Sequence, residues 1–199
     1  GYFSVGNGWR TKYNQRVYPF TAPSGTNTND YSYYVWEDED GTRHFFSRQG
    51  NTGSYKDESG VELTLTDTGT GDETYVITDK GGNKNCFDAQ GRLRRIKNNH
   101  STGSVIQLTH KTSGNTDRIY TITDGAGRGY KVHYERTRGF LTSIQYKGTG
   151  STVLAQVNYT MYEAGCQNEI EYGDGFRVIY SNTHYNILSV KHCESGGTE

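Results

Sequence analysis

A short segment recurs along this chain and constrains what it can fold into. In its clearest copy, residues 87–96, an aromatic residue and an acid lead through a turn that contains Gly91 into a strand that runs from Leu93 to Ile96. Later copies place apolar residues at the equivalent positions, which are Leu141 with Ile144 and Ile187 with Val190. These positions are almost evenly spaced, within the period of about 20–50 residues that is typical of stacked repeats. The spacing predicts a repeating β architecture in which these apolar residues point to one packed side of a sheet.

The rest of the chain follows the same pattern of short strands and turns. Acid and glycine residues, which favour turns, mark residues 40–43, 79–82, 124–128 and 174–177. Between the turns, apolar and polar residues alternate with period two, and glycine-free windows such as 151–164 lack the helical period of about 3.6 residues. The sequence therefore predicts an all-β fold, made of consecutive antiparallel hairpins that form one extended, twisted and curved sheet.

Individual segments can be assigned within this sheet. Residues 31–36 and 44–46 form a hairpin, residues 50–60 form a polar loop, and residues 153–161 form a long central strand. Residues 1–30 supply an edge strand or a capping hairpin, and residues 194–199 form a frayed tail. We expect residues 1–199 to make a single β-repeat region.

The composition limits the classes of protein to which this chain can belong. Only 31% of its residues are hydrophobic, but 17 Tyr and 7 Phe supply large rings that can build half-buried sheets. A disordered chain would lack these aromatic residues. The net charge of −1 gives no long-range attraction to nucleic acid, and no apolar run is long enough to insert into a membrane.

The recurring segment resembles the tyrosine-aspartate (YD) repeat of the Rhs family, whose core is Tyr-Asp-x-x-Gly-Arg-Leu. Residues 87–93 match this core with Phe87 in place of Tyr, and residues 124–128 match its Asp-x-x-Gly-Arg part, with Thr123 at the aromatic position. Residues 6–10, with Tyr13 and Gln15, are similar to the Gly-x-Gly-Trp segment that often precedes such repeats in wall-associated Rhs proteins. The resemblance thus places the chain in the N-terminal part of a repeat array.

The resemblance implies a fold and a function. Rhs-family repeats coil an antiparallel sheet into a hollow shell, so this chain would form a short arc of such a shell. Its function would be structural, as part of a large secreted or cell-surface bacterial protein that encloses or displays another segment, often a C-terminal toxin. Its partners would be the flanking repeats and the C-terminal segment of the same polypeptide. The residues that the motif marks are structural: Phe87, Asp88, Gly91, Arg92, Leu93, Ile96, Asp124, Gly127, Arg128, Leu141 and Ile144.

The sequence predicts no catalytic site, metal site or cofactor. Cys193 follows His192, but neighbours along a strand point to opposite faces, so they do not form a nucleophile and base pair. The simplest interpretation of the consecutive acids at residues 37–40 is a solvent-exposed turn, and calcium binding is a weaker alternative. Residues 125–129 precede a strand rather than a helix, which argues against a phosphate loop. We therefore expect a protein that is not an enzyme.

Several assignments have alternatives. The three cysteines are either free, partly buried thiols, or Cys166 and Cys193 form a disulfide. Arg92 and Arg128 are expected to staple adjacent hairpins by binding a carboxylate or carbonyl of a neighbouring turn. If tyrosine rings are exposed, they could stack on sugars, so the alternative function is a surface adhesin or carbohydrate-binding module that binds cell-surface glycans.

Overall fold

The computed structural model describes residues 10–20, 33–48, 53–57, 60–100, 105–113, 116–135, 139–150, 152–161, 167–182 and 187–194. Much of the predicted cap and all but the first residue of the predicted tail lie outside these ranges, as does Cys166. The strands are β1 (Arg16–Pro19), β2 (Tyr33–Glu37), β3 (Arg43–Arg48), β4 (Ser54–Asp57), β5 (Thr64–Asp67), β6 (Tyr75–Thr78), β7 (Lys84–Phe87), β8 (Leu93–Lys97), β9 (Val105–Ser113), β10 (Thr116–Thr123), β11 (Gly129–Tyr134), β12 (Leu141–Lys147), β13 (Val153–Met161), β14 (Gln167–Tyr172), β15 (Arg177–Asn182) and β16 (Ile187–Cys193).

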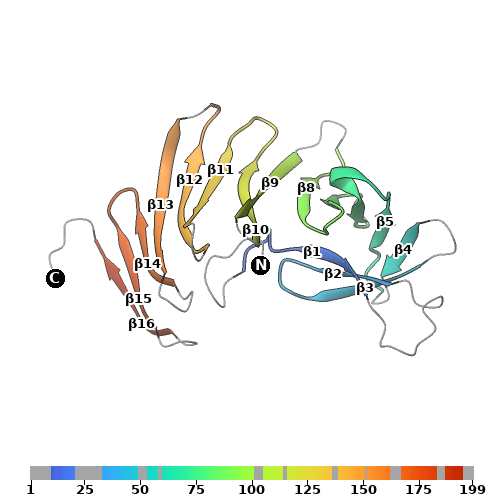
Figure 1. Cartoon of the computed structure of the whole chain (residues 1–199), viewed down its shortest axis with the longest axis horizontal. Coiled ribbons are helices and arrows are strands. Elements are labelled where there is room, and N and C mark those ends of the chain that lie inside the picture. Colours follow the sequence, from blue (N-terminus) through green and yellow to red (C-terminus); the bar gives the residue numbers. More distant parts are fainter. Residues whose placement is uncertain are drawn as a thin grey trace. The chain divides into compact units, whose positions relative to one another are not determined.

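All sixteen strands belong to one sheet, and their order in the sheet is their order in the chain (Figure 1). The pairings are antiparallel, so each strand returns beside the one before it. The predicted all-β fold of consecutive antiparallel hairpins is therefore confirmed. The described part of the chain contains no α-helix, only the 3₁₀ turn η1 (Gly71–Glu73), and no helix there is long and apolar enough to cross a membrane.

One predicted loop contains a strand. Residues 50–60 were expected to be irregular because they are polar, but β4 lies within them and pairs with both β3 and β5. Its one buried residue is Tyr55, which faces Leu65 of β5. A single buried ring in a four-residue strand leaves too little alternation to be recognised from sequence.

β-bulges explain why the recurring apolar residues are three positions apart. In β8, Leu93 pairs with Phe87 and Ile96 pairs with Asn85, so the register skips one residue, Arg94. Since Phe87 and Asn85 share a face, Leu93 and Ile96 also share one, although residues three apart in a regular strand would not. The same shift occurs in β12, where the register skips Thr142 and aligns Leu141 with Ile144. A further shift in β16 skips Leu188 and aligns Ile187 with Val190.

The chain divides into two compact units within this sheet, one of residues 11–108 and one that comprises residues 1–10 and 109–199. In the first unit, the register places a set of almost fully buried side chains on one face: Val17, Phe46, Leu65, Ile77, Phe87 and Leu93. The backbone of Val17 also contacts Gly91, in the turn between β7 and β8. The strands of this unit therefore roll up, and the face that carries these residues becomes its core.

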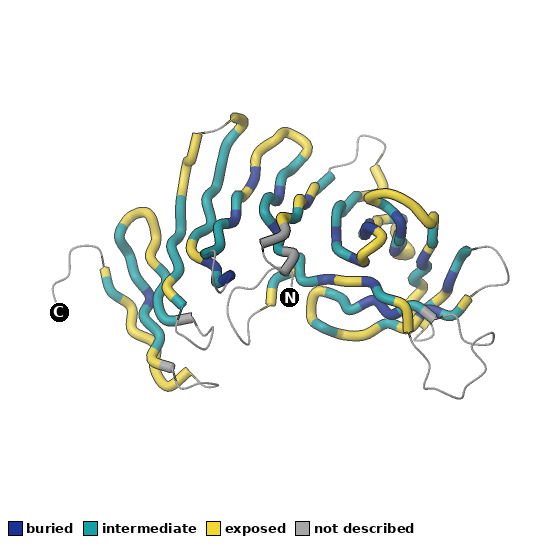
Figure 2. The backbone as a smooth tube through the Cα atoms, in the orientation of Figure 1, coloured by how far each residue is buried: buried dark blue, intermediate teal, exposed yellow. Residues whose placement is uncertain are grey.

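The second unit buries less of its apolar face. Ile119, Ile122, Val132, Leu141 and Val178 are buried. Towards its C-terminal end, however, Ile187 is 49% and Val190 46% exposed, and Figure 2 shows β16 as almost entirely exposed. The expectation that Ile187 and Val190 are packed is wrong, because β16 is the last strand in the order of the sheet and, among the described residues, only β15 pairs with it.

The difference in burial can be tested with two leucines of the second unit. Leu141 is 1% exposed, whereas Leu188 is 65% exposed. Leu141→Ala should lower the free energy of unfolding by about 2–5 kcal/mol, because it removes buried methyl groups and leaves a cavity. Leu188→Ala should change the free energy by less than about 0.5 kcal/mol. Urea denaturation monitored by circular dichroism measures both values, and equal losses would contradict the described packing.

Candidate functional site

Five hairpin turns share one hydrogen-bond pattern. In each, the first residue donates its N–H to the carbonyl of the fifth, and the fourth, a glycine, donates to the carbonyl of the first. That glycine has a positive φ in all five turns, a conformation that other residues rarely adopt. The turns span Asp38 to Thr42, Asp79 to Asn83, Asp88 to Arg92, Asp124 to Arg128, and Tyr172 to Phe176. Two of the predicted turns are therefore shifted, since Asp38 and Tyr172, not Asp40 and Asp174, begin them.

The geometry of the turn at residues 88–92 accounts for the Asp-x-x-Gly-Arg pattern. Asp88 Oδ1 accepts hydrogen bonds from the backbone N–H groups of Gln90 and Arg92, while its Oδ2 accepts one from Arg92 Nε at 2.8 Å. The carboxylate thus fixes the turn from inside, and the guanidinium satisfies the oxygen that remains. Asp124 makes the same three contacts, with Ala126 and Arg128. Both arginines therefore pair with the aspartate of their own turn, whereas the prediction placed their partner in a neighbouring turn.

The two copies differ in their surroundings. Asp88 is buried, and Arg92 exposes only a small part of its side chain. The Asp124 to Arg128 pair is open to solvent, where the hydrogen bond from the Arg128 side chain lowers the pKa of the Asp124 carboxyl. An identical local motif is thus a surface turn in the second unit and a packed turn in the first.

The packed turn forms a seam with the first strand. Val17 of β1 donates its N–H to the carbonyl of Gly91 at 3.0 Å, and Arg16 pairs with Arg92 in an isolated antiparallel bridge. A Cβ atom added to Gly91 would lie 1.7 Å from the carbonyl oxygen of Val17. Only glycine permits this approach, so Gly91 serves both the turn and the closure of the unit.

A buried glutamine completes the seam. Trp36 Nε1 and Asn85 Nδ2 both donate to Gln15 Oε1, at 3.3 and 3.1 Å, and Gln15 Nε2 donates to the carbonyl of Lys12. Gln15 therefore connects the start of β1 to β2 and β7. A single polar residue among other polar residues carries no signal of burial, so its role could not be derived from the sequence.

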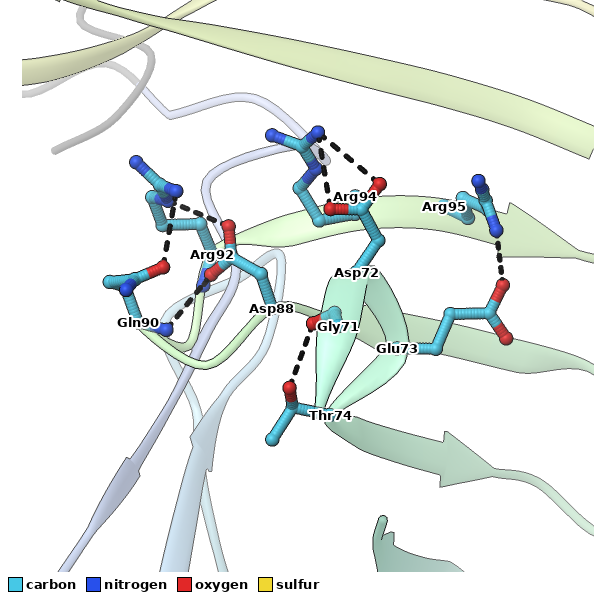
Figure 3. A network of polar contacts seen from close by, with 9 residues as sticks. All are labelled: Gly71, Asp72, Glu73, Thr74, Asp88, Gln90, Arg92, Arg94 and Arg95. Atoms are coloured by element: carbon cyan, nitrogen blue, oxygen red, sulfur yellow. Dashed lines mark hydrogen bonds and ion pairs between the residues drawn. The ribbon is translucent and has the colours of Figure 1, made fainter. Parts of the chain in front are cut away.

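A second group of contacts joins η1 to β8, the strand that follows the turn (Figure 3). The η1 residue Glu73 accepts hydrogen bonds from Arg95 and Lys97 of β8, and the bond from Lys97 is the main cause that lowers the pKa of Glu73. Next to it, Asp72 pairs with Arg94, the bulge residue. Cys86 is buried close by as a free thiol, and burial raises the pKa of Cys86 to about 11, which disfavours the reactive thiolate.

A row of polar side chains crosses four strands of the second unit. His133 Nε2 lies 3.0 Å from Gln145 Oε1, and Gln145 Nε2 donates to Gln156 Oε1 at 2.9 Å. Gln156 then donates to Asn158 Oδ1, and Asn158 donates to Glu171 Oε2. These residues occupy the face opposite to Val132 and Leu141, so this part of the sheet has one apolar and one polar face. The sequence contains the alternation, but only the strand register brings the five side chains together.

The residues that were weighed for catalysis or metal binding have structural contacts. Cys193 is a free thiol opposite Arg177, whereas His192 pairs with Val178 and so points to the other face. Asp38 holds its own turn and contacts His44 at 3.1 Å. Residues 125–129 form the hairpin turn between β10 and β11. Across the described ranges, no cluster of three or more His, Cys, Asp and Glu side chains is arranged to hold a metal ion.

The chain was compared with known proteins, and neither a family model nor a curated protein matches it.

The seam yields a prediction with a matched control. Gly91 and Gly127 occupy the same position of the same motif, with φ of 72° and 77°, but a Cβ at Gly127 would meet no atom within 4 Å. Gly127→Ala should therefore cost about 1–2 kcal/mol of stability, the penalty of a left-handed backbone conformation. Gly91→Ala adds a clash with the backbone of β1 and should cost at least about 3 kcal/mol. Equal losses in urea denaturation would show that the seam is not tightly packed.

Proposed function

We propose that this chain is a non-catalytic structural segment of a large secreted or cell-surface protein of the YD-repeat kind. It forms part of a β shell that encloses or displays another segment, such as a C-terminal toxin. Its partners are the flanking hairpins and that enclosed segment of the same polypeptide. The bacterial cell surface, where wall-associated Rhs proteins act, is the proposed location.

The recurrent turn is the observation that carries this proposal. Within the described ranges, the same five-residue geometry joins β2 to β3, β6 to β7, β7 to β8, β10 to β11 and β14 to β15. The two Asp-x-x-Gly-Arg copies use Asp, Gly and Arg for local hydrogen bonds. In the turn at residues 88–92, the Asp88 carboxylate binds backbone N–H groups of the turn and the Arg92 side chain. Such contacts stabilise the fold locally, as expected for a structural motif. A sheet in which every strand pairs with its neighbours in sequence can also be lengthened by adding hairpins at either end, as a shell wall needs.

The packing of the two units fits the same function. The first unit is held by its seam, while the residues of β16, the last described strand of the second unit, are largely exposed. Unpaired strand edges invite another strand to pair with them. In the proposed shell, the neighbour of β16 is the next hairpin of the same polypeptide.

The proposal is tested on the longer polypeptide that contains this segment. Cryo-electron microscopy should show the sixteen strands as part of a continuous β wall, with another segment of the chain inside it. Limited proteolysis should leave the enclosed segment intact for as long as the wall is folded, because a protease cannot pass a closed sheet. A segment that forms a separate module, with no flanking strand paired to β16, would overturn the proposal.

A further inference from the structure

We propose that the second unit carries a binding site for an acidic saccharide on the polar face of β10, β11 and β12. The carboxylate of a uronic acid residue binds between Lys131 and Lys147, and the adjoining sugar lies along the polar row from Gln145 onward. This site does not depend on the structural function proposed above, since a wall segment can bind a ligand on either face.

The site lies beside Gly129, where β10 and β11 approach closely: a Cβ atom added to Gly129 would lie 2.0 Å from the carbonyl oxygen of Ile122. Gly129 of β11 lies between Thr123 of β10 and Lys147 of β12 in the register of the sheet. Lys131, two residues along β11, faces the same side as Gly129. A depression of about 280 Å³ is lined by Gly129, Thr123, Lys147 and Lys131 together with Tyr120 and Thr121. A volume at the small end of ligand pockets suits one or two sugar rings rather than a large cofactor.

The depression is positively charged. The ammonium groups of Lys131 and Lys111 each lie 5.4 Å from the centroid of the Tyr120 ring, so both cations interact with this one ring. Lys147 is the second lysine, with Lys131, that lines the depression, and none of the described residues that line it is acidic. Within the part of the chain that the structure describes, none of these three lysines forms an ion pair. Their charge is therefore available to an oxygen anion, which lysine binds as a point charge.

The neighbouring groups favour a saccharide over a bare anion. Lys131 lines the depression and pairs across the sheet with Gln145, the second residue of the polar row. The polar row therefore lies directly beside the charged depression. Amide side chains offer both donors and acceptors, which vicinal sugar hydroxyls can match. The hydroxyl of Thr121, 2.6 Å from that of Thr109, adds a neutral polar group beside the lysines. A chain of acidic sugars presents this combination of carboxylates and hydroxyls.

The experiment measures binding of hexagalacturonate to the whole chain by isothermal titration calorimetry. Its methyl ester, which keeps the sugars but loses the charges, and inorganic phosphate, a free oxygen anion, serve as comparison ligands. We expect hexagalacturonate to bind and to weaken as salt is added, and both comparison ligands to bind at least about tenfold more weakly. Equal binding of the ester would overturn the charged site, and equal binding of phosphate would overturn the saccharide.

Charge variants locate the site. Lys131→Gln combined with Lys147→Gln should weaken hexagalacturonate binding at least about tenfold, because two charge-assisted contacts are lost. Lys191→Gln, which removes a lysine of β16 on the same polar face, should change binding less than about twofold. Amide chemical shifts of the unmodified protein give a readout that does not depend on the variants. Shifts should concentrate at Gly129, Lys131 and Lys147, and shifts confined to residues 11–108 would overturn the proposal.

Discussion

The contact between Gly91 and Val17 is the constraint on which the first unit depends. It joins the turn between β7 and β8 to β1, so the core residues between them are enclosed rather than spread on an open sheet. The contact needs three features at once: a glycine at positive φ, an aspartate that holds the turn, and a strand that passes close to its backbone. The turn is therefore a tertiary contact as well as a connection between strands.

The sequence predicted the architecture because that depends on local signals. Period-two alternation marks many of the strands, and acid and glycine residues occur together in five of the described hairpin turns. The three-residue spacing of Leu93 and Ile96 reflects the bulge that aligns them. The prediction failed where the local signal was weak or where burial depends on neighbours. β4 has a single buried ring, and Ile187 carries the same pattern as Leu93 but belongs to a strand at the end of the sheet.

The candidate site was only partly predictable, for a related reason. Asp88 and Asp124 begin the same Asp-x-x-Gly-Arg pattern and make the same hydrogen bonds, yet only the turn of Asp88 is packed against another strand. Which copy becomes the seam depends on where β1 passes, which no local pattern contains. Gln15 and the depression at Gly129 were missed for the same reason, because their partners are assembled by strand register.

Native-state hydrogen exchange at the amide of Val17 tests most directly the claim that the Asp-x-x-Gly-Arg turn closes the first unit. This amide donates to Gly91, so its exchange reports the opening of the seam. If the seam closes the unit, Val17 should exchange only when the whole unit unfolds, with the same opening free energy as the amides of Leu65 and Ile77. Fast exchange at Val17 while Leu65 and Ile77 remain protected would contradict the account, because the core would then be stable without the seam.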